Sequence, residues 1–139
     1  RLDREQEFGN DSNEDSAVTC ITLNGKNFIF PGDATGKTTG TIISKIDDIK
    51  LLKSELLLAS HHGADSHGSN NAEWAWITAP SYVVFSAGIN AGHKHPRLAA
   101  VHNYMPYLKE EGEHPFTFSG EIGRLKIAEN SPPLPECWK

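Results

Sequence analysis

Cysteine and methionine are scarce in this sequence of 139 residues, which contains two cysteines and one methionine. Cys20 and Cys137 are far apart and form no CxxC pair, so they define neither a cysteine metal site nor a redox compartment. Cys20 lies in a β-rich run and is expected to be a small buried apolar residue. No apolar run approaches the roughly 18 residues that a membrane-spanning helix needs, and no signal peptide is recognisable after Arg1.

Basic residues are fewer than acidic residues, 13 against 18, so the formal net charge is −5. This balance argues against a protein that binds nucleic acid through net positive charge. Hydrophobic residues make up 37% and charged residues 22%, which is typical of a globular domain with a real core. We expect a flexible acidic lead-in over residues 1–15, a folded domain over residues 16–128 and a proline-rich tail over residues 129–139.

The expected elements alternate between strands and helices, which predicts an α/β fold. Asn24-Gly25 between β-rich runs over residues 17–23 and 27–30 predicts a hairpin. The later elements are expected, in chain order, as a helix over 38–52, a strand covered on both faces over 55–60, a helix over 72–79, a strand over 82–87, a helix over 97–108 interrupted near Pro106, and strands over 116–119 and 123–128. In such folds, ligands gather where strands end.

The stretch FPGDATGKTT, residues 30–39, resembles a phosphate-binding loop at first sight. The phosphate-loop pattern is G-x-x-x-x-G-K-[ST], but Pro31 stands where the first glycine is needed and Gly32 comes one residue late. Because proline has no N–H to offer, nucleotide binding through Lys37 is only the third hypothesis. Asp33 then needs its own explanation, and taken alone it would be a turn aspartate or the N-cap of the following helix.

Histidine is abundant, and five of the seven histidines lie between His61 and His95. His61 and His62 follow one expected strand, and His93 and His95 lie in the loop after the next one. Together with Asp33 at an earlier strand end, these imidazoles form a zinc-type ligand set. A metal-bound water ionises near neutral pH and attacks phosphorus or a carbonyl carbon, so the set predicts hydrolytic chemistry.

The other histidines are weaker candidates. His102 and His114 are interpreted as ordinary exposed imidazoles. For His67, within the SHGS loop, a polar loop residue and a site residue are equally plausible. The metal hypothesis therefore depends on clustering at three strand ends rather than on any single histidine.

Three segments in this order resemble a known family: NEDSAVTCITLNGKNFIFPGD, LLLASHHGADSHGS and FSAGINAGHKHP. They are similar to the C-terminal half of a metallo-β-lactamase-fold hydrolase, closest to the subgroup of the soluble domain of the bacterial competence protein ComEC. The resemblance covers residues 10–105. It implies an α/β fold that is the C-terminal half of an αββα sandwich, a two-ion site for zinc or manganese, and hydrolysis of a phosphodiester or related ester, with nucleic acid among the candidate substrates.

The resemblance also implies roles for the ligand residues. Asp33 matches the aspartate that bridges two metal ions in the family and takes part in catalysis. His61 matches the later histidine ligand because it directly follows Ser60 at the strand end. The assignments of His61 and His62 could be exchanged, and His62 would otherwise support the ligands or contact the substrate.

Further residues are expected to contact the substrate or to support the site. His95 matches the His-Pro histidine at the mouth of the site, where it would contact the substrate or the transition state. Ser66 and Asn90 are predicted as additional substrate-binding or supporting residues. His93 has no counterpart in the family that the motifs identify.

One departure from the family is large: the motif His-x-His-x-Asp-His is absent, and no histidine precedes His61. Two ligands cannot close a tetrahedral site. We therefore expect a fragment that is inactive alone, whose partner is the missing N-terminal half of the fold. The competing hypothesis is a degenerate, non-catalytic half-domain that acts as an interaction module, for which an exposed apolar sheet face is expected. Compartment and substrate stay open.

Overall fold

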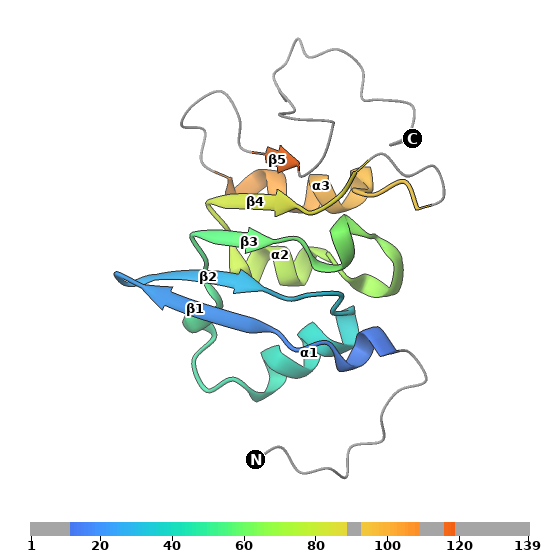
Figure 1. Cartoon of the computed structure of the whole chain (residues 1–139). Helices are drawn as coiled ribbons and strands as arrows, with labels where there is room; N and C mark the ends of the chain where they lie inside the picture. The colour runs from blue at the N-terminus through green and yellow to red at the C-terminus, as the bar shows by residue number, and fades with distance from the viewer. Residues whose placement is uncertain (1–11, 89–92, 109–115, 119–139) are drawn as a thin grey trace.

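The computed structural model describes residues 12–88, 93–108 and 116–118. These residues form a mixed five-stranded sheet in the order β1-β2-β3-β4-β5 (Figure 1). The strands are β1 (Thr19–Leu23), β2 (Lys26–Phe30), β3 (Leu56–Leu58), β4 (Tyr82–Phe85) and β5 (Phe116–Phe118). The helices are α1 (Gly36–Lys45), α2 (Ala72–Thr78) and α3 (Leu98–Tyr104), with the 3-10 helices η1 (Ser12–Asp15), η2 (Ile49–Leu52), η3 (Ser60–Gly63), η4 (Ser66–Gly68) and η5 (Met105–Tyr107). The predicted α/β class is confirmed.

The first two strands form the predicted hairpin. β1 and β2 pair antiparallel, and the two turn residues between them, Asn24 and Gly25, have φ values of 52° and 73°. Left-handed values at both central residues are what a two-residue hairpin loop requires, and Asn-Gly accepts them readily. The dipeptide therefore determined this turn.

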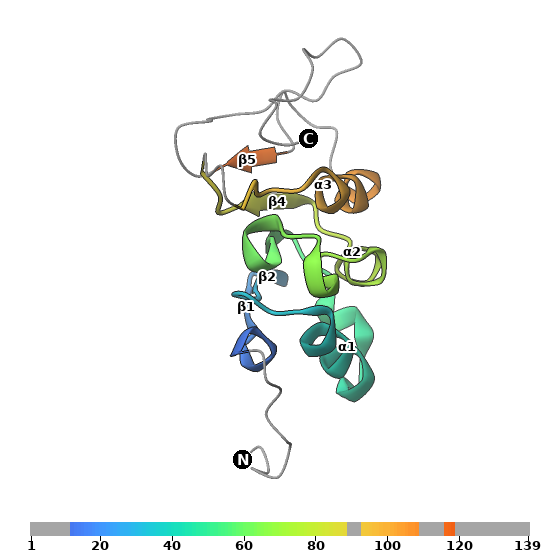
Figure 2. The same ribbon diagram turned by 90° about the vertical axis from the view of Figure 1, so that its right-hand side faces the viewer.

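All three α-helices lie on one face of the sheet (Figure 2). Strands β2 to β5 pair parallel with their neighbours, and α1, α2 and α3 lie in the crossovers between them. Successive strands are added in one direction across the sheet, and such crossovers are right-handed. Each helix therefore falls on the same side, and no described helix covers the opposite face.

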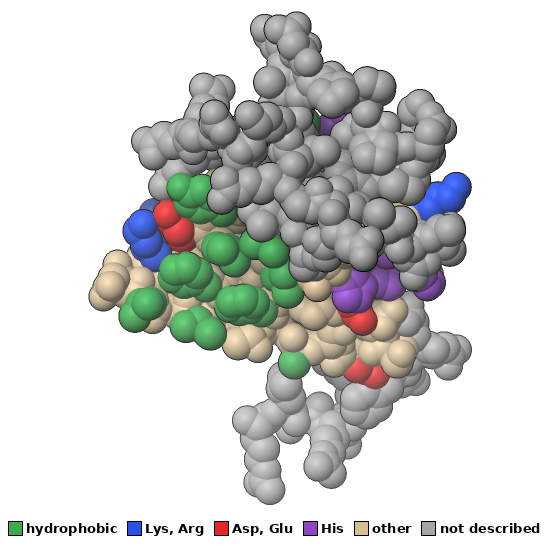
Figure 3. Space-filling view, turned by 45° about the horizontal axis from the view of Figure 1, so that its top comes forward, with side chains coloured by type: hydrophobic (Ala, Val, Ile, Leu, Met, Phe, Trp, Pro, Cys, Tyr) green, Lys and Arg blue, Asp and Glu red, His purple; other side chains and the backbone are tan. Residues whose placement is uncertain are grey.

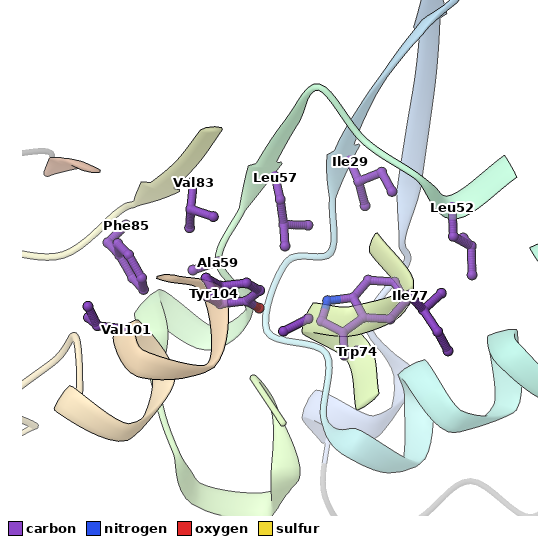
Figure 4. Packing of buried hydrophobic residues seen from close by; sticks show 11 residues of the cluster. Ile29, Leu52, Leu57, Ala59, Trp74, Ile77, Val83, Phe85, Val101 and Tyr104 are labelled. Atoms are coloured by element: carbon purple, nitrogen blue, oxygen red, sulfur yellow. The ribbon is translucent and has the colours of Figure 1, made fainter. Parts of the chain in front are cut away.

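The core lies between the sheet and the helices (Figure 4). It is built by period-two alternation, since Val83 and Phe85 of β4 are 1% and 0% exposed while the alternating residues Tyr82 and Val84 are partly exposed. Buried partners come from the neighbouring strands and from the helices, including Ile29, Leu57, Trp74, Ala75, Val101 and Tyr104.

The opposite face of the sheet is open and largely apolar (Figure 3). Ile21, Leu23 and Phe30 are 52%, 60% and 36% exposed. The prediction that strand 55–60 is covered on both faces is wrong, because Leu57 is buried while Leu56 and Leu58 stay partly exposed. The exposed apolar sheet face that was expected for an isolated half-domain is therefore present.

Two other expectations need correction. The helix predicted over 38–52 ends at Lys45, and Asp48 starts a separate 3-10 turn by accepting a hydrogen bond from the Lys50 backbone N–H at 3.0 Å. Cys20 is exposed rather than buried, because it lies on β1, whose five residues are all exposed at the edge of the sheet.

The ends of the chain are described only in part. Residues 12–15 of the expected flexible lead-in form η1, which contacts α1. The strand predicted over 116–119 is observed as β5, whereas the strand over 123–128 and the tail over 129–139 lie outside the described residues. In the described part of the chain, no helix has the length and apolar character needed to cross a membrane.

Candidate functional site

The carboxyl ends of β2, β3 and β4 meet at one edge of the sheet, where ligands gather in such folds. A pocket of about 380 Å³ opens there. Its lining consists of the predicted carboxylate, four histidines and three small residues: Asp33, His61, His62, His93, His95, Ser86, Ala87 and Gly88. Figure 3 shows histidine side chains gathered beside an acidic side chain at one end of the visible face.

Two predicted residues are not among the described residues that line this pocket. Ser66 lies in η4 and is exposed. Asn90 falls within residues 89–92, outside the described part of the chain. The structure thus brings Asp33, His61 and His95 to one pocket and leaves Ser66 out of it.

His62 is the histidine that faces the carboxylate. Its Nε2 lies 3.5 Å from Asp33 Oδ1, and both side chains are about half exposed. Its other ring nitrogen, Nδ1, lies 2.7 Å from the Ser86 carbonyl oxygen. Because a carbonyl oxygen only accepts, Nδ1 carries the hydrogen. In the neutral ring, Nε2 therefore presents its lone pair toward Asp33.

This arrangement places two electron-rich groups against each other. It is stabilised by a proton on His62 or by a cation shared between the two side chains. Histidines that bind metals usually donate their other N–H to a backbone carbonyl or carboxylate, which fixes the tautomer and the ring orientation. The bond from His62 to Ser86 has this form.

His61 occupies a different position in the pocket. Its ring centroid lies 6.3 Å from that of His62 and 5.8 Å from that of His95. Its Nδ1 is buried and has no hydrogen-bond partner among the described residues. A buried nitrogen without a partner is costly. Between the two histidines, His62 rather than His61 is at ion-pair distance from Asp33.

His95 and His93 form the other wall of the pocket. Their rings stack with centroids 5.7 Å apart. Burial, followed by the nearby His61 and Arg97, lowers the pKa of His95 below its ordinary value. A lowered pKa keeps the His95 imidazole neutral at neutral pH, so that one ring nitrogen donates and the other accepts.

The backbone of the histidine pair is unusual. His61, His62 and Gly63 have φ values of 47°, 57° and 86°. Left-handed values are uncommon outside glycine, and such residues concentrate at functional sites. A Cβ atom at Gly63 would lie 2.6 Å from Phe85 Cδ1 and 2.6 Å from Pro96 Cβ, so glycine is needed directly after the pair.

Asp33 is not the N-cap of α1, since that position is taken by Thr35. The turn before the helix is closed by a hydrogen bond from the Ala34 N–H to the Pro31 carbonyl at 3.2 Å. Neighbouring strand ends are tied together, because the His61 N–H donates to the Gly32 carbonyl at 2.9 Å. Asp33 therefore has no capping role in α1 and is free to serve the pocket.

The GKT residues after Asp33 contact the N-terminal segment. Lys37 Nζ lies 2.7 Å from Glu14 Oε2, and Thr38 Oγ1 donates to the Glu14 carbonyl oxygen at 2.8 Å. These bonds hold η1 against α1. They give Lys37 and Thr38 a structural role that needs no phosphate.

The donor types of the pocket fit zinc or manganese, which accept imidazole nitrogen and carboxylate oxygen. The described donor side chains are too few to complete a metal site. Within residues 12–88, 93–108 and 116–118, no group of three or more His, Cys, Asp or Glu side chains is arranged to hold a metal ion. Asp33 and His62 are thus an incomplete donor pair.

No family model, curated protein or solved structure matches the chain. The resemblance to metallo-β-lactamase-fold hydrolases rests on the three sequence motifs alone.

Sequence reasoning missed several residues that shape the site. The Ser86 carbonyl that orients His62 is a backbone group and leaves no sequence signal. Asn70, within the GSNN run, is 2% exposed and hydrogen-bonds to Ser60 and Ala64 on either side of the histidine pair. Its only signal was an asparagine in a loop beside a predicted site, which favours a local backbone contact.

Proposed function

We propose that this chain is the C-terminal half of a metal-dependent hydrolase of the metallo-β-lactamase superfamily, acting on a phosphodiester or related ester. One observation carries the proposal. His62 gives Nδ1–H to the Ser86 carbonyl at 2.7 Å and presents Nε2 to Asp33 at 3.5 Å, which is the donor arrangement of a metal-binding histidine beside a carboxylate.

In this proposal Asp33 and His62 are the ligands that this chain contributes to a zinc or manganese site. When bound, the ion acts as a Lewis acid and lowers the pKa of water. Ser86 fixes the tautomer of His62. His95, kept neutral by burial, donates a hydrogen bond to the oxygen on which negative charge develops.

The proposal assigns the missing ligands to the other half of the fold. A closed zinc site needs four donors, whereas the described residues bring Asp33 and His62 together and contain no group of three or more such donors. The open apolar face supports the same assignment, because two sheets of a sandwich pack through such faces. Its proposed occupant is the second sheet of the αββα sandwich, contributed by the N-terminal half.

The first test is a titration of zinc and of manganese into the whole chain. We expect weak binding by the unmodified chain, and a loss of affinity of about 10-fold or more in Asp33→Asn and in His62→Gln, by the magnitude typical of site residues. Both side chains are half exposed, so the melting temperature without metal should stay nearly constant.

Matched controls are Asp65→Asn and His102→Gln, which change an exposed carboxylate and an exposed imidazole outside the pocket lining. They should bind metal as the unmodified chain does. Equal affinity in Asp33→Asn and the controls would remove Asp33 from the site and with it the hydrolase proposal.

A second candidate function is a non-catalytic half-domain that pairs with another sheet. The observation that favours it is the open apolar face, where Ile21, Leu23 and Phe30 are exposed. The same titration separates the two candidates. Absence of metal binding by the unmodified chain, with the fold intact, would leave pairing through this face as the function.

A further inference from the structure

A buried asparagine lies behind the histidine pair. Asn70 is 2% exposed, and its Nδ2 donates to the Ser60 carbonyl at 2.8 Å and to the Ala64 carbonyl at 2.7 Å. Ser60 and Ala64 are the residues immediately before and after the run of left-handed residues His61, His62 and Gly63. One amide group thus ties together both ends of the turn.

The orientation of the Asn70 amide is itself fixed. Tyr104 Oη donates to Asn70 Oδ1 at 2.8 Å, which directs the oxygen toward α3 and the Nδ2 hydrogens toward the turn. Burial raises the pKa of Tyr104 far above neutrality, so the hydroxyl stays a donor. Asn103 Nδ2 holds the Asn70 backbone carbonyl at 2.8 Å.

The turn needs such support because its backbone is disfavoured. Left-handed conformations are unfavourable for residues with a Cβ, and both His61 and His62 adopt them. Ser60 and Ala64 are fully buried, so without Asn70 their carbonyls would lose the one side-chain donor that the described residues supply. A relaxed turn would rotate the imidazoles and break the approach of His62 to Asp33.

We infer that Asn70, oriented by Tyr104, is a positioning residue that holds the His61–His62 turn in the geometry in which His62 faces Asp33. The expected effect on metal affinity rests on the proposed function. The expected effect on the turn is independent of that function, and amide hydrogen exchange measures it separately.

The main variant is Asn70→Asp, which keeps the size of the side chain and the oxygen for Tyr104 but replaces the donor by an acceptor. The first readout is amide hydrogen exchange of the whole chain, comparing the His61 N–H, bonded to Gly32, with the Ala59 N–H, bonded to Val84 in the sheet. We expect exchange at His61 to rise about tenfold or more relative to Ala59, since two buried hydrogen bonds are lost.

Two further variants make the comparison specific. Tyr104→Phe removes only the bond that orients the amide, and a smaller rise of about threefold is expected at His61. Thr78→Val removes a buried hydroxyl that donates to the Trp74 carbonyl within α2 at 2.7 Å. This control lowers overall stability without touching the turn, so the ratio of His61 to Ala59 exchange should not change.

The second readout is zinc affinity, which should fall about 10- to 100-fold in Asn70→Asp, as is typical when a group supporting a ligand is lost.

An unchanged exchange ratio in Asn70→Asp would overturn the inference, as would faster exchange at His61 with unchanged zinc affinity. If the unmodified chain binds no zinc, the proposed function fails, and the exchange ratio alone decides whether Asn70 holds the turn. If Asn70→Asp does not fold, Tyr104→Phe is judged by the same ratio.

Discussion

Two loops of similar composition follow neighbouring parallel strands, and they use their polar groups in different ways. The loop after β2 leads into the GKT residues, where Lys37 and Thr38 are bonded to Glu14. The loop after β3 contains the histidine pair, where His62 presents Nε2 to Asp33 and His61 Nδ1 is buried without a hydrogen-bond partner among the described residues.

The difference shows that polar residues in a glycine-rich loop indicate a site only when packing leaves their functional atoms available. In the GKT segment, the ammonium and hydroxyl groups hold η1 to the helix. In the histidine loop, the supporting bonds come from the backbone and from Asn70, which leaves His62 Nε2 facing Asp33. Three substitutions test this contrast.

The largest effect is expected at Gly63, in the histidine loop. Gly63→Ala would combine a φ of 86° with a Cβ only 2.6 Å from both Phe85 and Pro96. Strain and overpacking together should lower the free energy of unfolding by about 3 kcal/mol or more. Urea denaturation measures this change.

The matched control is Gly25→Ala, where φ is 73° but no atom lies within 4 Å of the added Cβ. It isolates the backbone strain, which should cost about 1 kcal/mol. If both variants lose the same free energy of unfolding, the close contact of the added Cβ with Phe85 and Pro96 does not contribute to the loss at Gly63.

The sequence predicted those features that depend on local periodicity and turn chemistry. The Asn24-Gly25 hairpin and the strands β3 and β4 follow directly from residue patterns. The convergence of Asp33 with the later histidines at one pocket also followed, because parallel strands end at the same edge. Their roles as ligands stay predictions.

Features set by distant contacts could not be predicted. Nothing in the run ELLLAS shows that all helices would fall on one face, which left Leu56 and Leu58 partly exposed. The left-handed pair His61–His62 depends on Asn70 and Tyr104, the latter more than 40 residues away in the sequence. The choice between His61 and His62 as the partner of Asp33 was likewise beyond local reasoning.

An intermediate effect is expected at Gly36, where the two loops touch. A Cβ at Gly36 would lie 3.0 Å from the Gly68 carbonyl oxygen and 3.1 Å from that of His67. Gly36→Ala should therefore cost about 1 kcal/mol, because these are backbone atoms that must shift. Gly40→Ala, in the same helix with open space around the added Cβ, should instead gain about 0.5–1 kcal/mol. Equal gains in both variants would show that the loops are not in close contact.

The smallest effect is expected at Lys37, and it tests whether the GKT segment is structural. The Lys37 side chain is 64% exposed and pairs with Glu14 at 2.7 Å. Lys37→Ala should cost only about 0.2–1 kcal/mol, the usual range for an exposed ion pair. Lys26→Ala is the matched control, since Lys26 is 56% exposed and pairs with Glu55 at 3.0 Å.

Thermal unfolding with and without ATP distinguishes a structural lysine from a phosphate-binding one. A ligand that binds only the folded chain raises its stability, so a phosphate loop would give an ATP-dependent shift that Lys37→Ala removes and Lys26→Ala keeps. We expect no such difference, because the first glycine of the pattern is replaced by Pro31 and the Lys37 ammonium is bonded to Glu14. An ATP shift that depends on Lys37 would mean that both loops bind ligands, and the contrast between them would no longer hold.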